Sequence, residues 1–409
     1  MVVRYRAVLS APGCARVFAT ALFGRLPQGM LSLAILLLVR GRTGSYAAAG
    51  IAVGAYALSS AACAPIQGRL VDRFGRVPVL APAALLQGVA LVALVAAGRV
   101  PAPLLILLAA LAGALVPSLA PAVRALLREL LTDPALRETA YSLESVIQEL
   151  IWITGPLVVA VVITFTSPSG AVLLSAGICI AGTLLFLSTP VVRHAGPRRT
   201  SAERGRVLEI PAVRALLGPI ALMGTSLGAI EVGLPSLALH AGSRPSAGLL
   251  LAMWSVGSMA GGLWFGSRSW RASLSTRYRT LLLAAVLCCA PLIAARTIPE
   301  GTVGALLAGL TIAPVFSCQY ALIGQAVTPG VETEAFTWAA AALIGGLAAG
   351  SALGGAVISA AGVSAPFILA CAASGLAALS AVRLRTVVET PVEVPVEVPV
   401  EVPGGCGVR

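Results

Sequence analysis

Charged residues are scarce in this sequence. They make up 11% of the 409 residues, whereas a soluble domain usually contains about 25%. Hydrophobic residues make up 58% of the chain, and the mean hydropathy is +0.95. A water-soluble core of this length could not hide so much apolar surface. The composition therefore excludes a soluble globular protein and predicts an integral membrane protein.

The residue types that metal and enzyme chemistry need are also scarce. The histidines are His194 and His240, and the eight cysteines include no CxxC pair, so a Cys/His metal site is not expected. The sequence contains no Walker loop, no HExxH and no paired-aspartate diphosphate motif. These absences argue against an ATP-driven pump and an intramembrane enzyme. We expect neither a metal nor another cofactor.

Lysine is absent, and all 28 basic residues are arginines, which give a net charge of +12. The arginines form no long stripe, so nucleic acid is not an expected partner. If the N-terminus is cytoplasmic, 22 arginines fall in inside segments, 5 in outside loops and Arg25 within a span. Because cytoplasmic loops are enriched in arginine, both termini are predicted to be cytoplasmic. The arginine- and alanine-rich composition is typical of a GC-rich genome, and we expect a bacterial plasma-membrane protein.

Apolar runs of membrane-spanning length recur along the chain. A helix needs roughly 20 apolar residues to cross ~30 Å of hydrocarbon. Twelve runs meet this measure, at 17–39, 47–67, 79–97, 104–123, 142–165, 171–187, 216–239, 248–265, 281–295, 302–326, 337–359 and 366–382. The ninth run is short and is expected to extend backward. The sequence thus predicts an all-α membrane protein with twelve transmembrane helices.

The runs divide into two halves of six spans. The predicted halves cover 1–188 and 215–385, with a cytoplasmic central loop at 189–214 and a disordered tail at 386–409. Short matches support a duplication: ALFG at 21–24 returns as ALMG at 221–224, and Gly155 matches Gly350 near the fifth span of each half. The tail repeats Pro-Val-Glu-Val, which forbids a helix and favours extended chain. It is interpreted as a spacer, with a docking segment as the alternative.

A charged segment, GRLVDRFGRVP at 68–78, interrupts the apolar pattern between the second and third spans. It closely resembles the signature loop of the major facilitator superfamily, Gly-x-Leu-(Ala/Val)-Asp-Arg-x-Gly-Arg-basic, at the place where that family keeps it. Val77 departs from the pattern where a further basic residue is common. The resemblance implies the major facilitator fold and a gating role for Gly68, Asp72, Arg73, Gly75 and Arg76.

The resemblance also implies partners for this gating loop. Asp72 is expected to face the positive N-terminal end of the eleventh span, near 336–338. Glu332 and Glu334 precede that span and are the expected partners of Arg73 or Arg76. Such contacts can exist only while the cytoplasmic side is closed. A solvated positive loop is the alternative interpretation. The corresponding segment of the second half has Trp270 in the place of the aspartate, which predicts an asymmetric gate.

Ionisable residues within spans are costly and indicate a polar pathway. Arg25, Glu149 and Glu231 are the candidates, together with Gln28 beside Arg25. Glu144 is interpreted as a residue at the cytoplasmic boundary. Depth along the helices predicts that Arg25 pairs with Glu149, which leaves Glu231 free to bind a proton or a cationic substrate; structural bridges are the alternative. Many proton-coupled members of the family that this sequence resembles carry an intramembrane arginine in the fourth span. The predicted fourth span at 104–123 contains none.

The predicted function is secondary transport by alternating access, with proton-coupled efflux of a small amphipathic or hydrophobic compound. The missing arginine in the fourth span leaves proton coupling open, and an organic-anion site would need more cationic side chains than Arg25. Uptake of a metabolite by the same fold is the alternative, and a nonconducting sensor is a further one. The expected partners are the lipid bilayer, a small-molecule substrate and protons, and the protein is expected to be a monomer.

Overall fold

The structure is a computed structural model that describes residues 2–98, 100–194, 207–243 and 246–383. These residues form helices without any strand. The N-terminal group of helices contains α1 (Val2–Ser10), α2 (Cys14–Thr43), α3 (Tyr46–Phe74), α4 (Arg76–Ala96), α5 (Ala102–Ala114), α6 (Leu119–Leu130), α7 (Pro134–Phe165), α8 (Pro168–Ser188) and α9 (Pro190–His194). The C-terminal group contains α10 (Pro211–His240), α11 (Ser246–Gly266), α12 (Leu274–Cys289), α13 (Pro291–Ala294), α14 (Ile298–Gly309), α15 (Ile312–Ala326), α16 (Glu332–Ala361) and α17 (Ala365–Ser380).

Eleven helical segments in the described residues are long and apolar enough to cross a membrane, and α17 is a shorter apolar helix. They match the twelve predicted runs, so the predicted all-α membrane fold is confirmed. The ninth span begins at Leu274 and so extends backward as expected. The eleventh span begins at Glu332, five residues before its predicted start at 337. That early start decides which residues form the helix N-terminus.

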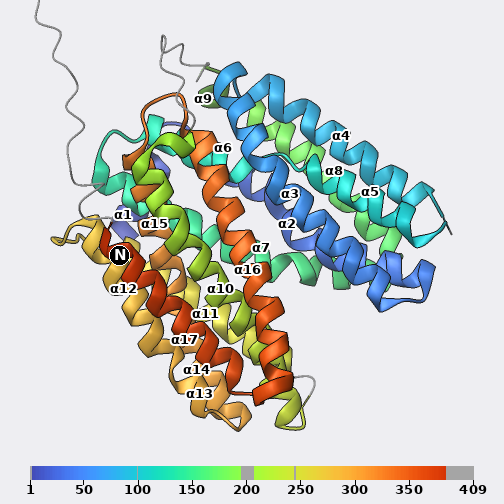
Figure 1. The fold of residues 1–409 in the computed structure, drawn as a ribbon. Coiled ribbons are helices and arrows are strands. Elements are labelled where there is room, and N and C mark those ends of the chain that lie inside the picture. Colours follow the sequence, from blue (N-terminus) through green and yellow to red (C-terminus); the bar gives the residue numbers. More distant parts are fainter. Residues whose placement is uncertain (1, 99, 195–206, 244–245, 384–409) are drawn as a thin grey trace, which may run out of the picture.

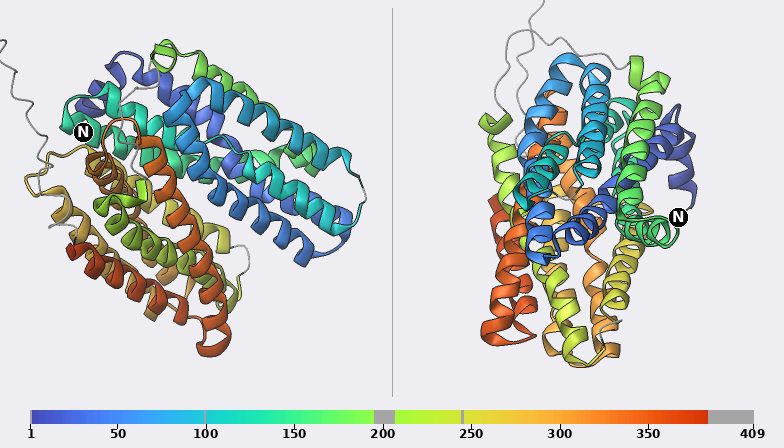
Figure 2. Two further views of the ribbon diagram at one scale, coloured as in Figure 1. Left: turned by 45° about the horizontal axis from the view of Figure 1, so that its top comes forward. Right: turned by 90° about the vertical axis from the view of Figure 1, so that its right-hand side faces the viewer.

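The two groups of helices meet at one end and diverge toward the other. Figure 1 shows α2, α3, α4, α5 and α8 running side by side, while α10, α12, α16 and α17 run in a different direction from a meeting region near α6 and α15. The turned views in Figure 2 show the same two groups. We call the meeting region the closed end. The predicted division of the chain at 189–214 stays a prediction, because 195–206 lie outside the described residues. The predicted tail at 386–409 also lies outside them.

Two spans are interrupted at matching places. The fourth span breaks between Ala114 and Leu119, and the tenth breaks between Gly309 and Ile312. At the first break, Gln67 of α3 satisfies the freed backbone: its Nε2 donates to the Val116 carbonyl at 3.0 Å, and its Oε1 accepts from the Ser118 amide at 2.7 Å. A membrane-embedded break requires such partners. After the break, the fourth span continues as α6, whose residues 119–127 are buried in the protein.

Small residues allow the close approach of spans within each group. A Cβ added at Gly155 would collide with the backbone of Gly29 on α2, and one added at Gly350 would collide with the backbone of Thr225 on α10. Each of these glycines therefore packs against the first span of its own group. Gly346 packs in the same way on Ala221, so α16 presents a close-packing face of small residues to α10.

Candidate functional site

The signature segment is the end of a helix rather than a loop. α3 runs on through Asp72 to Phe74, and α4 begins at Arg76. Gly75 joins them with φ of 92° and ψ of 168°, a conformation that only glycine adopts readily. Gly68 permits close approach: a Cβ there would lie 2.5 Å from Thr337 Oγ1 and 2.9 Å from Glu334 Cα, both on α16. Glycine at these two positions brings the end of α3 against the start of α16.

Asp72 caps the helix of the opposite group. Its carboxylate oxygens accept from the backbone amides of Thr333 at 3.1 Å and Glu334 at 2.8 Å. These amides belong to the first turn of α16, where backbone donors have no partner within the helix. The predicted contact with the start of the eleventh span is therefore confirmed. It lies at 333–334 instead of 336–338 because α16 begins earlier than expected. We call it the aspartate contact.

The predicted partners of the other arginines are wrong. Glu334 pairs with Arg69, at 2.6 and 3.1 Å, rather than with Arg73 or Arg76. Arg76 follows the Gly75 turn and binds Glu129 of its own group, because the turn directs it toward α6.

Two further contacts complete this region. Glu332 faces Arg128 of α6 at 3.5 Å. The guanidinium of Arg73 lies over the Phe74 ring, 4.9 Å from its centroid.

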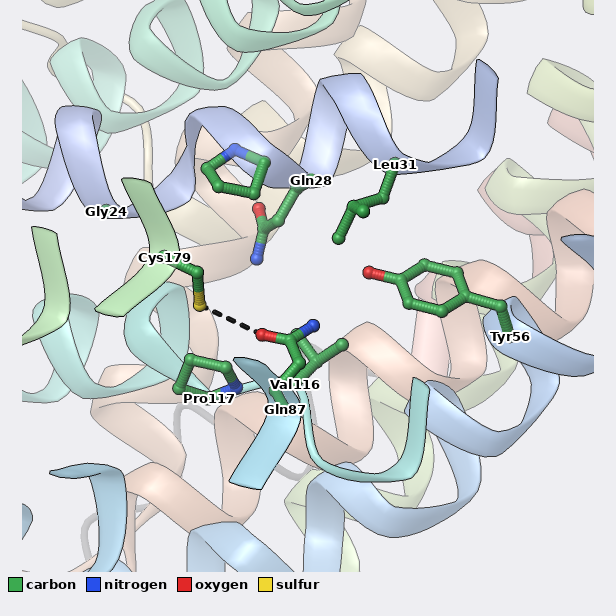
Figure 3. A pocket seen from close by; sticks show the side chains of 9 residues that line it. Gly24, Gln28, Leu31, Tyr56, Gln87, Val116, Pro117 and Cys179 are labelled. Carbon is green, nitrogen blue, oxygen red and sulfur yellow. Dashed lines mark hydrogen bonds between the residues drawn. The ribbon is translucent and has the colours of Figure 1, made fainter. Parts of the chain in front are cut away.

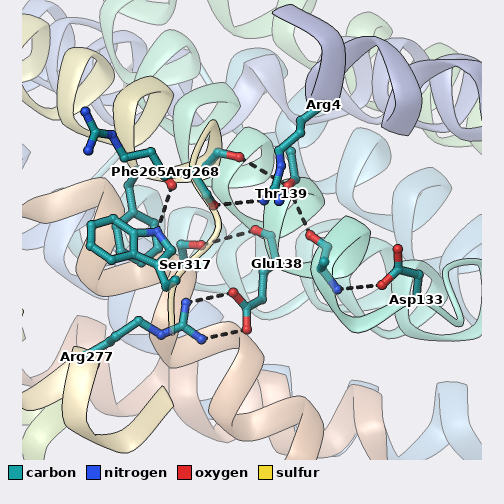
Figure 4. Close-up of polar contacts among 11 residues, drawn as sticks. Arg4, Asp133, Glu138, Thr139, Phe265, Arg268, Arg277 and Ser317 are labelled. Atoms are coloured by element: carbon teal, nitrogen blue, oxygen red, sulfur yellow. Dashed lines mark hydrogen bonds and ion pairs between the residues drawn. The ribbon is translucent and has the colours of Figure 1, made fainter. Parts of the chain in front are cut away.

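A second contact joins the two groups on the other side of the closed end. Arg277 of α12 donates two hydrogen bonds to the carboxylate of Glu138 on α7, both at 2.7 Å (Figure 4). Ser317 of α15 donates to the Glu138 carbonyl at 3.4 Å. A bidentate pair of this kind is stronger and more directional than a single ionic contact. We call it the arginine contact.

Hydroxyl groups near the start of α7 extend the arginine contact. Thr139 donates to the Gly266 carbonyl at 3.1 Å, and Ser142 donates to the Gly262 carbonyl at 2.6 Å. The Gly266 carbonyl lies at the C-terminal end of α11, where carbonyls lack helical partners, and the Gly262 carbonyl lies one turn earlier. Trp270 donates to the Phe265 carbonyl at 3.1 Å and stacks on the Phe265 ring, so it packs locally and does not replace Asp72. The predicted asymmetry of the gate agrees with this geometry.

The short helix α1 lies across the arginine contact. The Tyr5 hydroxyl donates to the carbonyls of Gly262 and Leu263 at 3.2 and 3.0 Å. Arg4 donates to the Arg268 carbonyl at 2.8 Å (Figure 4). Burial raises the pKa of the Tyr5 phenol, so the hydroxyl remains a donor at neutral pH. The N-terminal segment thereby ties itself to the opposite group of helices.

A buried ionic cluster lies inside the protein, between α2, α6 and α7. Arg25 donates to Glu144 Oε1 at 2.7 Å, and its other terminal nitrogen donates to Gln148 Oε1. The Nε of Arg124 lies 3.4 Å from the same Glu144 oxygen. Arg25 and Glu144 are fully buried, and Arg124 is 6% exposed. We call Arg25, Arg124, Glu144 and Gln148 the arginine cluster.

The arginine cluster corrects three expectations. Arg25 pairs with Glu144 and not with Glu149, and Glu144 is a buried partner instead of a boundary residue. The depth estimate failed because α7 begins at Pro134, which places Glu144 about ten residues, or ~15 Å, into the helix. The fourth span does carry a buried arginine, Arg124, because the span resumes after its break.

Glu149 bridges the two groups without a cation. It is 8% exposed, and its Oε1 accepts from the Ser258 hydroxyl of α11 at 2.9 Å. Among the described residues no guanidinium pairs with it. The Glu149 carboxylate therefore lies buried at the boundary between the two groups of helices, with a neutral hydroxyl as its donor.

The other two predicted pathway residues make no hydrogen bond or ion pair with the arginine cluster among the described residues. Glu231 of α10 is exposed and makes no hydrogen bond or ion pair with any residue that the structure describes. Gln28 lines a small pocket inside the N-terminal group with Tyr56, Gln87 and Cys179 (Figure 3), where Cys179 Sγ donates to Gln87 Oε1 at 2.9 Å. Among the described residues, no hydrogen bond or ion pair joins any two of the four pathway candidates. Over the described ranges, no group of three or more His, Cys, Asp or Glu residues could hold a metal ion.

Comparisons with known proteins agree with this architecture. An uncharacterised MFS-type transporter, y4rN, of Sinorhizobium fredii is 24% identical over 402 residues, covering 93% of this chain and 97% of that protein. The human organic anion transporter MFSD10 (TETRAN) superposes with a TM-score of 0.73 at 17% identity, covering 90% of this chain and 99% of that one. A bacterial homologue of the iron transporter ferroportin, in an outward-facing state, gives 0.72 at 14% identity, covering 91% and 99%.

The family model described as Major Facilitator Superfamily matches residues 17–298, which is more than half of the chain. The match includes the signature segment and the arginine cluster. The chain belongs to the major facilitator superfamily, and it is a multi-pass membrane transporter rather than an enzyme.

Proposed function

We propose that the protein is a proton-coupled secondary transporter that exports a small amphipathic compound across a bacterial plasma membrane by alternating access. The observation that carries the proposal is the closed end itself. The aspartate contact and the arginine contact join opposite groups of helices, and both consist of hydrogen bonds that can break and re-form. A rocking equilibrium between two arrangements needs such reversible contacts.

The closed end faces the cytoplasm in this proposal. Twenty-two of the 28 arginines occupy the segments on that side, against 5 on the other. The structure then corresponds to an outward-facing state, and both termini are cytoplasmic. A bacterial relative supports placement in the plasma membrane. We expect the protein to act as a monomer.

Glu149 is the proposed proton carrier. It is buried, has no cationic partner among the residues that the structure describes and binds Ser258 of the opposite group, so its protonation state is coupled to the contact between the groups. Arg124 now supplies the buried arginine of the fourth span whose absence had counted against proton coupling. Glu231 remains the second candidate carboxylate.

An amphipathic substrate fits the side chains near the ionic residues. Aromatic rings of Tyr141, Phe316, Tyr320 and Phe336 lie 6.1 to 6.4 Å apart beside the arginine cluster. The structural similarity to MFSD10, a human organic anion transporter, supports a substrate with a polar head. Uptake by the same fold is the alternative, because the geometry of one state does not fix the direction of net transport.

Proton coupling can be tested in inverted membrane vesicles that carry the full chain and a respiration-driven pH gradient. Three probes of matched shape are added: 1-naphthoate, 1-naphthamide and 1-naphthylmethylamine. At least one should dissipate the gradient in a protein-dependent way, and Glu149→Gln should abolish that response while Glu209→Gln, at an exposed position, preserves it. Accumulation with no movement of protons would exclude the coupling, and accumulation in the opposite direction would favour uptake.

A further inference from the structure

The arginine cluster carries more positive than negative charge. Arg25 and Arg124 both face one oxygen of one carboxylate, Glu144 Oε1, at 2.7 and 3.4 Å. Gln148, the fourth member, is neutral. Within the part of the chain that the structure describes, no second carboxylate pairs with either guanidinium. The cluster therefore holds one positive charge in excess, buried in the protein.

The hydrogen-bonding capacity of the cluster is also incomplete. The Nε atoms of Arg25 and Arg124 and the Oε2 atom of Glu144 are buried and make no hydrogen bond with any residue that the structure describes. A buried, unpaired charge is unfavourable, and native proteins retain one mainly where it serves a ligand or a pathway. Arg124 is the less satisfied of the two cations, because the longer contact with Glu144 is its only ion pair within the described ranges.

An aromatic side chain of the opposite group of helices packs on the arginine cluster. The guanidinium of Arg124 lies 3.9 Å from the ring centroid of Tyr320 on α15. Tyr320 stacks on Phe316 and meets Tyr141 and Phe336 edge to face. When the closed end opens, α15 separates from α6, and the excess positive charge becomes accessible beside an aromatic wall.

From this juxtaposition we infer that the arginine cluster binds the anionic group of an aromatic or otherwise amphipathic organic anion, with Arg124 as its principal partner. The inference rests on the proposed function and adds the charge of the substrate to it. A guanidinium matches a carboxylate in geometry and charge, and the aromatic rings provide the apolar surface for the rest of the molecule. Arg25 stays bound to Glu144 and Gln148, so Arg124 is free to exchange Tyr320 for the ligand.

Binding of 1-naphthoate, measured by calorimetry on the purified full chain in lipid nanodiscs, tests the inference. The neutral 1-naphthamide and the cationic 1-naphthylmethylamine have nearly the same shape, so they isolate the effect of charge. We expect 1-naphthoate to bind at least about tenfold more tightly than either analogue. Arg124→Gln should remove this preference, Arg124→Lys should restore part of it, and Arg296→Gln, an exposed arginine at the other end of the molecule, should leave it unchanged.

Arg124→Gln leaves the neutral pair of Arg25 and Glu144 in place, so the variant is expected to fold. Its unfolding temperature in the absence of probe checks this point. Equal affinity for the three probes, or a preference for the anion that survives in Arg124→Gln, would overturn the inference.

The result separates the inference from the proposed function. Proton-coupled movement of the neutral or cationic probe without binding of 1-naphthoate would refute the anion site alone. Arg124-dependent binding of 1-naphthoate without any proton movement would refute the coupling alone.

Discussion

The aspartate contact and the arginine contact both join the two groups of helices, but the first uses the N-terminal end of a helix and the second uses a C-terminal end. Asp72 accepts hydrogen bonds from amides in the first turn of α16. Across the closed end, Thr139 donates a hydrogen bond to the carbonyl of Gly266, the last residue of α11, and Ser142 donates to the Gly262 carbonyl one turn earlier. In both cases one group of helices supplies the side chains and the other supplies backbone atoms of a helix end; the α16 amides and the Gly266 carbonyl have no partner within their own helices.

The two contacts differ in how their charge is arranged. The aspartate contact uses a negative charge at the positive end of a helix, a favourable arrangement. The arginine contact places its charge in a separate pair, Arg277 with Glu138, and leaves neutral hydroxyls for the helix end. At the aspartate contact a single carboxylate therefore makes the hydrogen bonds between the two groups, whereas at the arginine contact several side chains share them. Loss of a single residue should therefore matter more at the aspartate contact.

The largest effect is expected away from both contacts, in the arginine cluster. Glu144→Ala leaves Arg25 and Arg124 buried with no carboxylate, and removal of one partner of a buried pair costs ~3–5 kcal/mol. We expect a large loss of folded protein, measured by size-exclusion yield and unfolding temperature. The double change of Arg25→Ala with Glu144→Ala should cost less than the sum of the two single alanine changes. Strictly additive losses would contradict the pairing and would show that the contacts at the closed end dominate stability.

The next largest effect comes from Asp72→Asn. An amide accepts at only one of its two positions, so the closed end should lose about 1–3 kcal/mol of stabilisation. The measurement is the distance between spin labels at Arg73 and Arg271, exposed positions of opposite groups, in a cysteine-free background. A longer-distance population should grow while the amount of protein in the membrane stays normal. An unchanged distribution would remove the gating role.

Arg277→Lys tests the arginine contact, and its effect should be smaller than that of Asp72→Asn. Lysine keeps the charge but cannot form the bidentate pair with Glu138, while Thr139 and Ser142 remain. We expect the distance distribution to shift in the same direction as in Asp72→Asn but less, by about 1 kcal/mol. If Arg277→Lys opened the closed end more than Asp72→Asn, the proposed division of charge between the two sides would be wrong.

The smallest effect is expected for Tyr5→Phe. The change removes one hydroxyl that donates to α11 from a partly buried position, so we expect a cost of about 0.5 kcal/mol, the low end of the usual range. Tyr46→Phe, an exposed tyrosine with no hydroxyl hydrogen bond among the described residues, is the matched control. A small shift toward the opened state in Tyr5→Phe alone, seen with the same spin labels, would show that α1 stabilises the closed end. Equal behaviour of the two variants would assign α1 no such role.

The sequence was informative where the membrane or a helix end imposes a rule. The spans follow from apolar length, and the aspartate contact follows from a carboxylate that meets a helix N-terminus. The pairing of Arg25 could also have been found. Asp133 followed by Pro134 is a typical helix start, and the Asp133 side chain does accept from the Ala135 amide at 2.9 Å. Counting depth from Pro134 places Glu144, not Glu149, level with Arg25.

The burial of Arg124 and the pairing in the arginine contact could not be predicted from the sequence. Arg124 lies in a stretch with Arg128 and Glu129 that has the composition of a loop, and only packing between α6, α7 and α15 makes it part of the interior. Arg277 and Glu138 are 139 positions apart, and no local pattern relates them. Both depend on how distant helices meet, which composition and periodicity do not encode.

The most direct test of the account follows both ends of the molecule at once. Spin labels at Arg73 and Arg271 report on the closed end, and labels at Gly41 and His240, near the far ends of α2 and α10, report on the other. We predict that the two distances change in opposite senses when Asp72→Asn is introduced: the first lengthens and the second shortens. A lengthening at the closed end with no change at the other, or two distances that never change, would contradict alternating access around these contacts.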